Sequence, residues 1–273
     1  NGRTMKIAAS DIAPASRAAT LNHEPFPFGW IDDYLPPALY QALEAGFVSP
    51  SDHPEAGTLA KGKKRIVFAV PPNPTNLGPM SDAWQDWLAA IGSREFRTDC
   101  LAWVRALLPL DTLPEGPYRD LFRMRQALGP DDTEMQCEFS TLGPGVSLRP
   151  HSDSADKILT FVHYFAPAGW QAAWDGGTEI YRPIDPRQAV NFSNFFLPRE
   201  AVTCVARSDY RPNRLFFFAK NDRSWHGVAP LSPATALPRP SFNFTLRIKA
   251  DRVSGEMAAL EAAIRAAERP AFG

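Results

Sequence analysis

The segment Arg149-Pro150-His151-Ser152-Asp153 decides how the rest of this 273-residue chain is interpreted. In an extended segment, side chains two residues apart leave the backbone on the same face. His151 and Asp153 can therefore direct an imidazole and a carboxylate at one point. The triplet alone is a weak signal, because His-x-Asp arises by chance in roughly one such chain in four. The rest of the sequence must supply a third ligand.

Trp225-His226-Gly227 supplies the candidate for that ligand. His226 follows the apolar run from Arg214 to Ala219, and four or five predicted strands separate it from His151. This separation is enough to bring a later strand beside the first one in a double-layered barrel. Two imidazoles and one carboxylate form the facial triad that holds Fe(II) and leaves the other coordination positions open. Taken alone, His226 would more often be a core or rim histidine.

The last apolar run, residues 240–248, has a polar face and an apolar face. Arg239, Ser241, Asn243 and Thr245 alternate with apolar residues, and in a barrel one face of a strand packs against the shell while the other faces the lumen. A buried guanidinium without an anion loses several kcal/mol of hydration. Arg239 and Ser241 together offer a fork of donors and a hydroxyl, which predicts a carboxylate receptor.

The composition excludes several classes of protein. Hydrophobic residues make up 44% of the chain and the net charge is -1, which predicts a packed core and no bulk attraction to nucleic acid or anionic membranes. Three cysteines lie far apart without a Cys-x-x-Cys spacing, so we expect neither disulfides nor a zinc ribbon. The same pattern predicts a reducing compartment. No membrane span or signal-peptide core stands out. We expect a cytoplasmic protein without nucleic-acid or membrane partners.

The hydrophobic pattern predicts one structural domain in three parts. Residues 5–117 are expected to form a helical layer packed on a barrel, and residues 118–250 the β core itself. Residues 251–273 have the Ala, Glu and Arg content of a terminal helix, with Ser254 as its cap. About eight short strands with regular turns indicate a sandwich or barrel. The fold class is therefore mainly β with flanking helices.

Within these parts, individual segments have their own signals. Apolar residues at helical spacing predict a helix from Pro36 and two more within residues 81–109. A strand is expected at 65–70, and a further short strand is expected at 122–128, before a turn. Lys61 to Arg65 holds four basic residues, which we interpret as a solvated loop rather than a ligand site.

The run from Gly143 to Ile248 resembles the 2-oxoglutarate/Fe(II)-dependent dioxygenases, and among them the prolyl-hydroxylase-like branch. The motifs that carry the resemblance follow one another in the family's order. They are Pro150-His151-Ser152-Asp153, Lys157 to Phe165, Trp170, Gly176-Gly177-Thr178-Glu179-Ile180-Tyr181, Asn213 to Phe218, Trp225-His226-Gly227-Val228-Ala229-Pro230 and Arg239-Pro240-Ser241. The run from Gly143 to Ile248 that contains them covers a little under half of the chain.

The resemblance implies a double-stranded β-helix, or jelly-roll, barrel. It implies that His151, Asp153 and His226 are the iron ligands and that Arg239, assisted by Ser241, holds the distal carboxylate of 2-oxoglutarate. Tyr164 matches a strand tyrosine that often bonds the same carboxylate. Thr160 and Val162 share its face and are expected to line the pocket, with Thr160 among the residues that bind the cosubstrate. His163 points the other way and is interpreted as structural. Arg247, Lys249 and Arg214 are the other cations considered for the 2-oxoglutarate anchor.

The activity that the resemblance implies uses Fe(II), 2-oxoglutarate and O2. We expect hydroxylation of an unactivated C–H bond in an amino acid, a peptide or a small metabolite, with release of succinate and CO2. Residues 139–142 lack the tyrosine that prolyl hydroxylases often carry there, and this absence weakens the case for a prolyl substrate. Asp153 is an intact acidic ligand, which disfavours halogenation. Trp170, Trp174, Arg149, Asp222 and Arg223 are candidates for the mouth of the site.

Two alternatives remain open from the sequence. One is a cupin-type metal-dependent isomerase or hydrolase with the same three ligands, although the His-Glu-x-x-His helix of many zinc hydrolases is absent. The other is a barrel that binds a carboxylate without catalysis. Fold alone does not choose between them, because function depends on the site.

Overall fold

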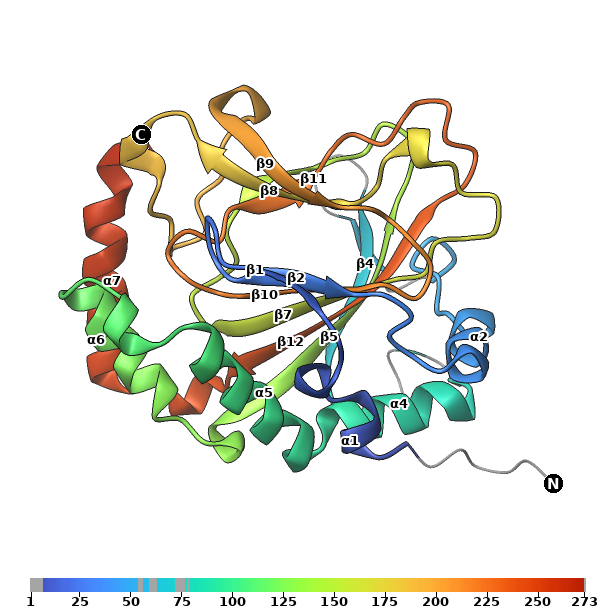
Figure 1. Cartoon of the computed structure of the whole chain (residues 1–273), viewed down its shortest axis with the longest axis horizontal. Helices are drawn as coiled ribbons and strands as arrows, with labels where there is room; N and C mark the ends of the chain where they lie inside the picture. Colours follow the sequence, from blue (N-terminus) through green and yellow to red (C-terminus); the bar gives the residue numbers. More distant parts are fainter. Residues whose placement is uncertain (1–6, 54–55, 59–62, 72–76, 78, 273) are drawn as a thin grey trace.

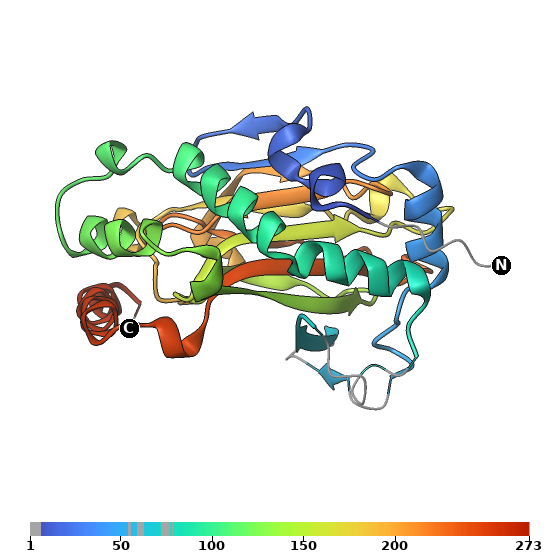
Figure 2. The same cartoon turned by 90° about the horizontal axis from the view of Figure 1, so that it is seen from below.

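The computed structural model of the chain describes residues 7–53, 56–58, 63–71, 77 and 79–272. Two antiparallel β-sheets face each other, and helices cover the outer side of the larger sheet (Figures 1 and 2). The helices are α1 Ala9–Ile12, α2 Pro37–Ala45, α4 Asp82–Gly92, α5 Arg94–Leu107, α6 Pro117–Gln126 and α7 Gly255–Glu268.

The larger sheet has the strand order β1-β2-β10-β7-β12-β5-β4-β3, and the smaller sheet has the order β6-β11-β8-β9. The strands of the larger sheet are β1 Thr20–Asn22, β2 Phe28–Ile31, β3 Gly57–Thr58, β4 Lys64–Ala69, β5 Thr133–Leu142, β7 Lys157–Tyr164, β10 Leu215–Ala219 and β12 Arg239–Ile248. Those of the smaller sheet are β6 Leu148–His151, β8 Thr178–Pro183, β9 Val202–Ser208 and β11 His226–Val228.

The eight strands from β5 to β12 form the predicted double-stranded β-helix. The chain passes from one sheet to the other at every connection except the one from β8 to β9, so each sheet receives four of these strands. Non-consecutive strands become neighbours in this way, as with β12 between β5 and β7. The sequence prediction of a jelly-roll barrel is confirmed.

Side chains along β12 point alternately to the hydrophobic core under the helices and to the cavity between the two sheets. Phe242 and Phe244 face the helices, where their rings lie 4.8 Å from Trp84 and 6.0 Å from Trp87. Trp84 also donates its indole N–H to the Leu43 carbonyl at 2.9 Å, which joins α2 and α4. Each fully buried large side chain contributes about 1.5–3 kcal/mol of burial free energy. The predicted helices within 81–109 are therefore part of the barrel's own core.

Residues 122–128 correct one sequence prediction. The pattern predicts a strand there, but most of these residues belong to helix α6. Their polar and apolar residues alternate over so short a run that the strand and helix periods are hard to tell apart. Pro117 at the first turn favours a helix, and Leu121, Phe122 and Arg125 form its buried face. The β core begins at Thr133 instead.

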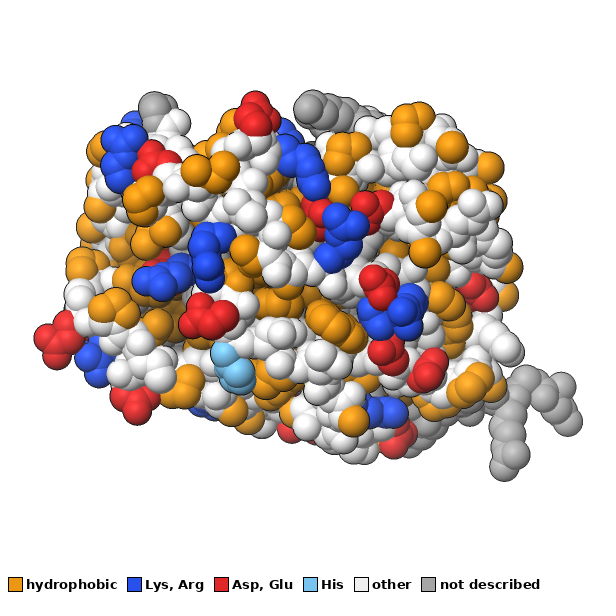
Figure 3. All heavy atoms as spheres, turned by 45° about the horizontal axis from the view of Figure 1, so that its top comes forward, with side chains coloured by type: hydrophobic (Ala, Val, Ile, Leu, Met, Phe, Trp, Pro, Cys, Tyr) orange, Lys and Arg blue, Asp and Glu red, His pale blue; other side chains and the backbone are white. Residues whose placement is uncertain are grey.

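The face that carries the smaller sheet has basic and acidic side chains next to one another (Figure 3). Arg207 pairs with Asp175 at 3.0 Å and with Glu179 at 2.6 Å, and Arg199 pairs with Glu179 at 2.5 Å. The charges of this strand pair thus compensate one another. Within the part of the chain that the structure describes, no helix has both the length and the apolar character needed to cross a membrane.

Candidate active site

The three predicted metal ligands meet at one end of the smaller sheet. His151 ends β6 and His226 begins β11, and the two residues are direct partners in the strand pairing. Their ring centroids lie 4.4 Å apart. Asp153 follows β6 by two residues, and one ligand atom from each of the three side chains lies within 4.8 Å of the others. All three are buried, so they form a compact donor set for one metal ion.

Backbone carbonyls fix the orientation of both imidazoles. Nδ1 of His151 lies 2.8 Å from the Arg149 carbonyl oxygen, and Nδ1 of His226 lies 2.8 Å from that of Ser224. A carbonyl oxygen can only accept, so each Nδ1 carries the proton and each Nε2 keeps a free lone pair. Burial lowers the pKa of His151 to about 3 and also lowers that of His226. Both rings are therefore neutral donors of the kind that metals require.

Asp153 completes the donor set as an anion. Burial alone would raise the pKa of its carboxyl group, but the charge of Lys157 and its hydrogen bond to the carboxylate hold the pKa well below its usual range. Lys157 Nζ lies 2.8 Å from Oδ1, and the Thr160 hydroxyl donates to Oδ2 at 2.9 Å. A carboxylate has about four acceptor sites, so both oxygens retain capacity for a metal. This donor chemistry fits Fe(II).

Gly227 lets β11 fit between its neighbours. A Cβ at this position would lie 2.5 Å from the Leu148 carbonyl oxygen and 3.0 Å from the Tyr181 ring. The first distance is shorter than any normal contact with backbone, so a larger residue would push β11 away from β6. The glycine after His226 thus keeps His226 beside His151.

A cavity of about 680 Å³ opens in front of the three ligands, between the two sheets. Thr160 and Val162 of β7 line it, together with Ser241, Asn243 and Thr245 of β12. These residues occupy the inward positions that strand alternation predicts. Phe161, Phe242 and Phe244, which alternate with them, are buried in the core under the helices.

Arg239 is a buried cation that has no carboxylate partner among the described residues. Only 3% of it is exposed, and it lines the cavity. Its Nε donates to the Gly176 carbonyl and its Nη1 to Ser241 Oγ at 3.4 Å, while Nη2 is buried without a partner within the described chain. The rings of Tyr164 and Tyr210 lie 5.3 Å and 4.9 Å from the guanidinium carbon. This orphaned donor fits the carboxylate of 2-oxoglutarate.

Tyr164 takes a different place from the one expected. Its hydroxyl lies 2.7 Å from Thr178 Oγ1 and accepts the Thr178 backbone N–H at 3.1 Å. Tyr164 is fully buried and does not belong to the cavity lining, whereas Thr178 does. The structure therefore puts Thr178 on the wall and places the tyrosine ring behind Arg239.

The other cations considered from the sequence as the 2-oxoglutarate anchor lie outside the cavity lining. Each has an oxygen partner of its own: Arg247 with Asp156 at 2.9 Å, Lys249 with the Asp131 carbonyl at 2.8 Å, and Arg214 with Asp32 at 2.6 Å. Of the loop residues considered for the mouth, Arg149 lines the cavity, and Trp170, Trp174, Asp222 and Arg223 do not. His163 lies on the outer face of the larger sheet, as expected, against Tyr34 and Tyr40.

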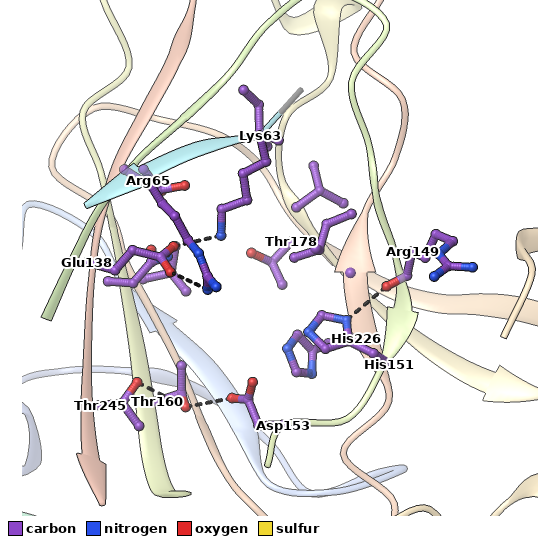
Figure 4. Close-up of a pocket in the computed structure, with 18 of the residues that line it drawn as sticks. Lys63, Arg65, Glu138, Arg149, His151, Asp153, Thr160, Thr178, His226 and Thr245 are labelled. Carbon is purple, nitrogen blue, oxygen red and sulfur yellow. Dashed lines mark hydrogen bonds and ion pairs between the residues drawn. The ribbon is translucent and has the colours of Figure 1, made fainter. Parts of the chain in front are cut away.

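Among the cavity residues that sequence reasoning missed, four are important for the arguments below. Phe196 stacks on His151 with ring centroids 5.3 Å apart, and no local pattern announces it. Lys63, Arg65 and Glu138 lie across the cavity from the histidines (Figure 4). The interpretation of Lys61 to Arg65 as a solvated loop is wrong for Lys63, which is buried, and for Lys64 and Arg65, which belong to strand β4. Lys61 lies outside the described residues. Period-two alternation in β5 and β4 was the available signal for Glu138 and Arg65, since their neighbours Phe139 and Ile66 are apolar.

Comparison with known proteins adds a match to a family model. Residues 137–247 match the family model described as the 2OG-Fe(II) oxygenase superfamily, a range that includes the three ligands and Arg239. No curated protein matches the chain.

Three solved structures are among those to which the chain is similar. A Pseudomonas putida prolyl-4-hydroxylase is 16% identical, with 89% of this chain and 98% of that one covered and a TM-score of 0.49. A Trichoplax adhaerens prolyl hydroxylase in complex with a hypoxia inducible factor peptide fragment is 15% identical, with 83% and 86% covered and a TM-score of 0.47. The alpha ketoglutarate dependent epimerase SnoN from nogalamycin biosynthesis is 14% identical, with 81% and 78% covered and a TM-score of 0.45.

Proposed function

Residues 137–247 of this chain belong to the 2OG-Fe(II) oxygenase superfamily, and on that premise we propose that the protein hydroxylates an unactivated C–H bond of a small-molecule or peptidyl substrate. Fe(II) and 2-oxoglutarate are the typical cofactor and cosubstrate of this superfamily. One observation carries the proposal: His151, Asp153 and His226 converge on one point of a cavity that also contains the unpaired guanidinium of Arg239.

The three metal ligands and the buried arginine have separate roles in this proposal. His151, Asp153 and His226 hold the iron, and Arg239 with Ser241 binds the distal carboxylate of 2-oxoglutarate beside Thr178. When bound, Fe(II) supplies the oxidising chemistry with O2, and 2-oxoglutarate leaves as succinate and CO2. Asp153 remains as an acidic ligand, which supports oxygen rather than halide transfer.

The protein's own contribution is position and shielding. The two carbonyl-anchored imidazoles need no reorientation when metal binds, since their free Nε2 atoms are already set. Phe218 and Val162 give the cavity an apolar wall on the side of β10 and β7. Such a wall excludes water from the substrate's reacting carbon.

The compartment is part of the proposal. The sulfur atoms of Cys100, Cys137 and Cys204 are all free thiols, and Cys204 is exposed. Free thiols and a ferrous site both favour a reducing environment, which supports a cytoplasmic location.

An anaerobic titration tests the proposal. Metal-free protein receives Fe(II) and then 2-oxoglutarate, and the visible charge-transfer band of the chelate is followed. A band that needs both components supports the proposal, and metal binding without any band would favour the cupin-type or binding-only alternatives. Once a substrate is found by succinate release, reaction under labelled O2 must put one labelled oxygen into the product; an isomerised product without oxygen would overturn hydroxylation.

A further inference from the structure

A second charged cluster lies in the same cavity and has no role in holding iron or 2-oxoglutarate. Lys63 is only 8% exposed, and its Nζ lies 2.6 Å from Glu138 Oε1. Arg65 Nη1 lies 3.3 Å from Glu138 Oε2, and Asn243 Nδ2 donates to Oε1 at 2.9 Å. Figure 4 shows Lys63 and Arg65 directed toward Glu138, across the cavity from the histidines.

The cluster holds more positive than negative charge. Burial would raise the pKa of Glu138, but Lys63 and Arg65 outweigh this and lower it, so the carboxylate is ionised. Two cations then share one anion. The Arg65 side chain is 38% exposed, and among the described residues only its Nη1 has an acceptor. The remaining nitrogens of this guanidinium are therefore open to solvent and available to a ligand in the cavity.

The cavity as a whole also has an excess of positive charge. Among the residues that the structure describes, five cationic and two anionic side chains line it: Lys63, Arg65, Arg149, Lys157 and Arg239 against Glu138 and Asp153. Bound Fe(II) and the 2-oxoglutarate dianion have opposite charges of equal size, so their binding leaves this excess unchanged. The molecule that fills the remaining space therefore meets a positive field.

The position of the cluster suits one end of a substrate. Glu138 is on β5 and Thr160, which bonds the ligand Asp153, is on β7, with only β12 between them. Two strand spacings amount to about 10 Å. A substrate that reaches from the cluster to the iron can thus place an anionic group and a reacting carbon several bonds apart.

We propose that Lys63 and Arg65 recognise the primary substrate and that this substrate is a carboxylate, held by the Arg65 fork while its reacting carbon faces the iron ligands. The cluster has one positive charge in excess, and the planar guanidinium of Arg65 matches a carboxylate in charge and geometry. Glu138 and Asn243 act as positioning residues that hold the two cations on the wall. The inference rests on the proposed function, because it takes the other side of the cavity to be the site of oxidation.

The test uses two probes of the same shape, 4-phenylbutanoate and 4-phenylbutanamide. They are titrated calorimetrically into protein loaded with Fe(II) and 2-oxoglutarate without oxygen. We expect the acid to bind about tenfold more tightly than the amide, the size expected for one charge-assisted contact. Arg65→Gln should abolish that preference and Arg65→Lys should restore part of it. Lys64→Gln is the matched control, because Lys64 alternates to the opposite face of β4 and does not line the cavity.

The possible outcomes separate this inference from the proposed function. Absence of the charge-transfer band in the wild-type protein means that the proposed function fails. A normal band with equal binding of acid and amide, or with binding of neither, overturns the carboxylate site alone. The carboxylate site is also overturned if the Arg65→Gln variant keeps the preference for the acid, or if this variant weakens 2-oxoglutarate binding instead.

Discussion

Replacement of Arg239 by glutamine is the sharpest test of the 2-oxoglutarate site. The guanidinium has one buried nitrogen without a partner among the described residues and one that contacts Ser241 at 3.4 Å. Glutamine keeps a donor of similar reach but loses the charge and the fork. The proposed iron ligands lie on or beside β6 and β11, so the change should leave metal binding intact while it removes the proposed anchor for the distal carboxylate.

The expected loss follows from the burial of Arg239. Removal of one partner from a buried, hydrogen-bonded charge pair costs about 3–5 kcal/mol, and each 1.4 kcal/mol is a factor of about ten in affinity. Since glutamine keeps one hydrogen bond, we take the lower end of this range. The dissociation constant of 2-oxoglutarate should therefore rise by about a hundredfold.

The assay is the anaerobic titration of the Fe(II)-loaded variant with 2-oxoglutarate, followed by the charge-transfer band. The band should reach its normal height at saturation, because chelation at the metal is unchanged, but with a midpoint shifted to higher concentration. Arg149→Gln is the matched control, since Arg149 also lines the cavity and lies over Phe196 rather than beside Ser241. An affinity for 2-oxoglutarate that changes as little in the Arg239 variant as in this control would refute the reasoning.

Four further substitutions test other parts of the structure. His226→Ala should leave no stoichiometric Fe(II) after desalting, and one retained equivalent by metal analysis would contradict the triad. Thr160→Val removes the hydroxyl that bonds Asp153 and should weaken Fe(II) binding about tenfold without loss of stoichiometry; unchanged metal affinity would refute that role. Trp84→Ala should lower the free energy of unfolding by about 3–5 kcal/mol in denaturant titrations, and a separate transition for the helices would refute a single domain. Burial lowers the pKa of His163 to about 3 from 6.5. Between these pH values the unfolded state binds more protons than the folded state, so the free energy of unfolding falls as the pH drops from 6.5. His163→Phe should reduce the slope of stability against pH by up to about 1.4 kcal/mol per pH unit, and an unchanged slope would show that His163 does not titrate this way.

Some features of the site are predictable because they depend on backbone geometry alone. Alternation along residues 239–245 is enough to assign Arg239, Ser241 and Asn243 to one face, since strand side chains must point to opposite sides. The same rule pairs His151 with Asp153. The predicted strand at 122–128 is wrong because a run of that length satisfies the helix and strand periods almost equally.

Other features require the register between distant strands. The place of Lys63 and Arg65 in the cavity depends on the pairing of β4 with β5, which brings them to Glu138 from 75 and 73 residues away. The Tyr164 hydroxyl bonds Thr178 only because β8 crosses it from the other sheet. Covalent geometry sets which side chains share a face of a strand and whether the His and Asp of a His-x-Asp segment can point at one metal. The order of amino acids is sufficient to predict both of these features. Which charges meet, and which donor stays unpaired, follows from the alignment of strands that lie far apart in the chain, and only the folded barrel fixes that alignment.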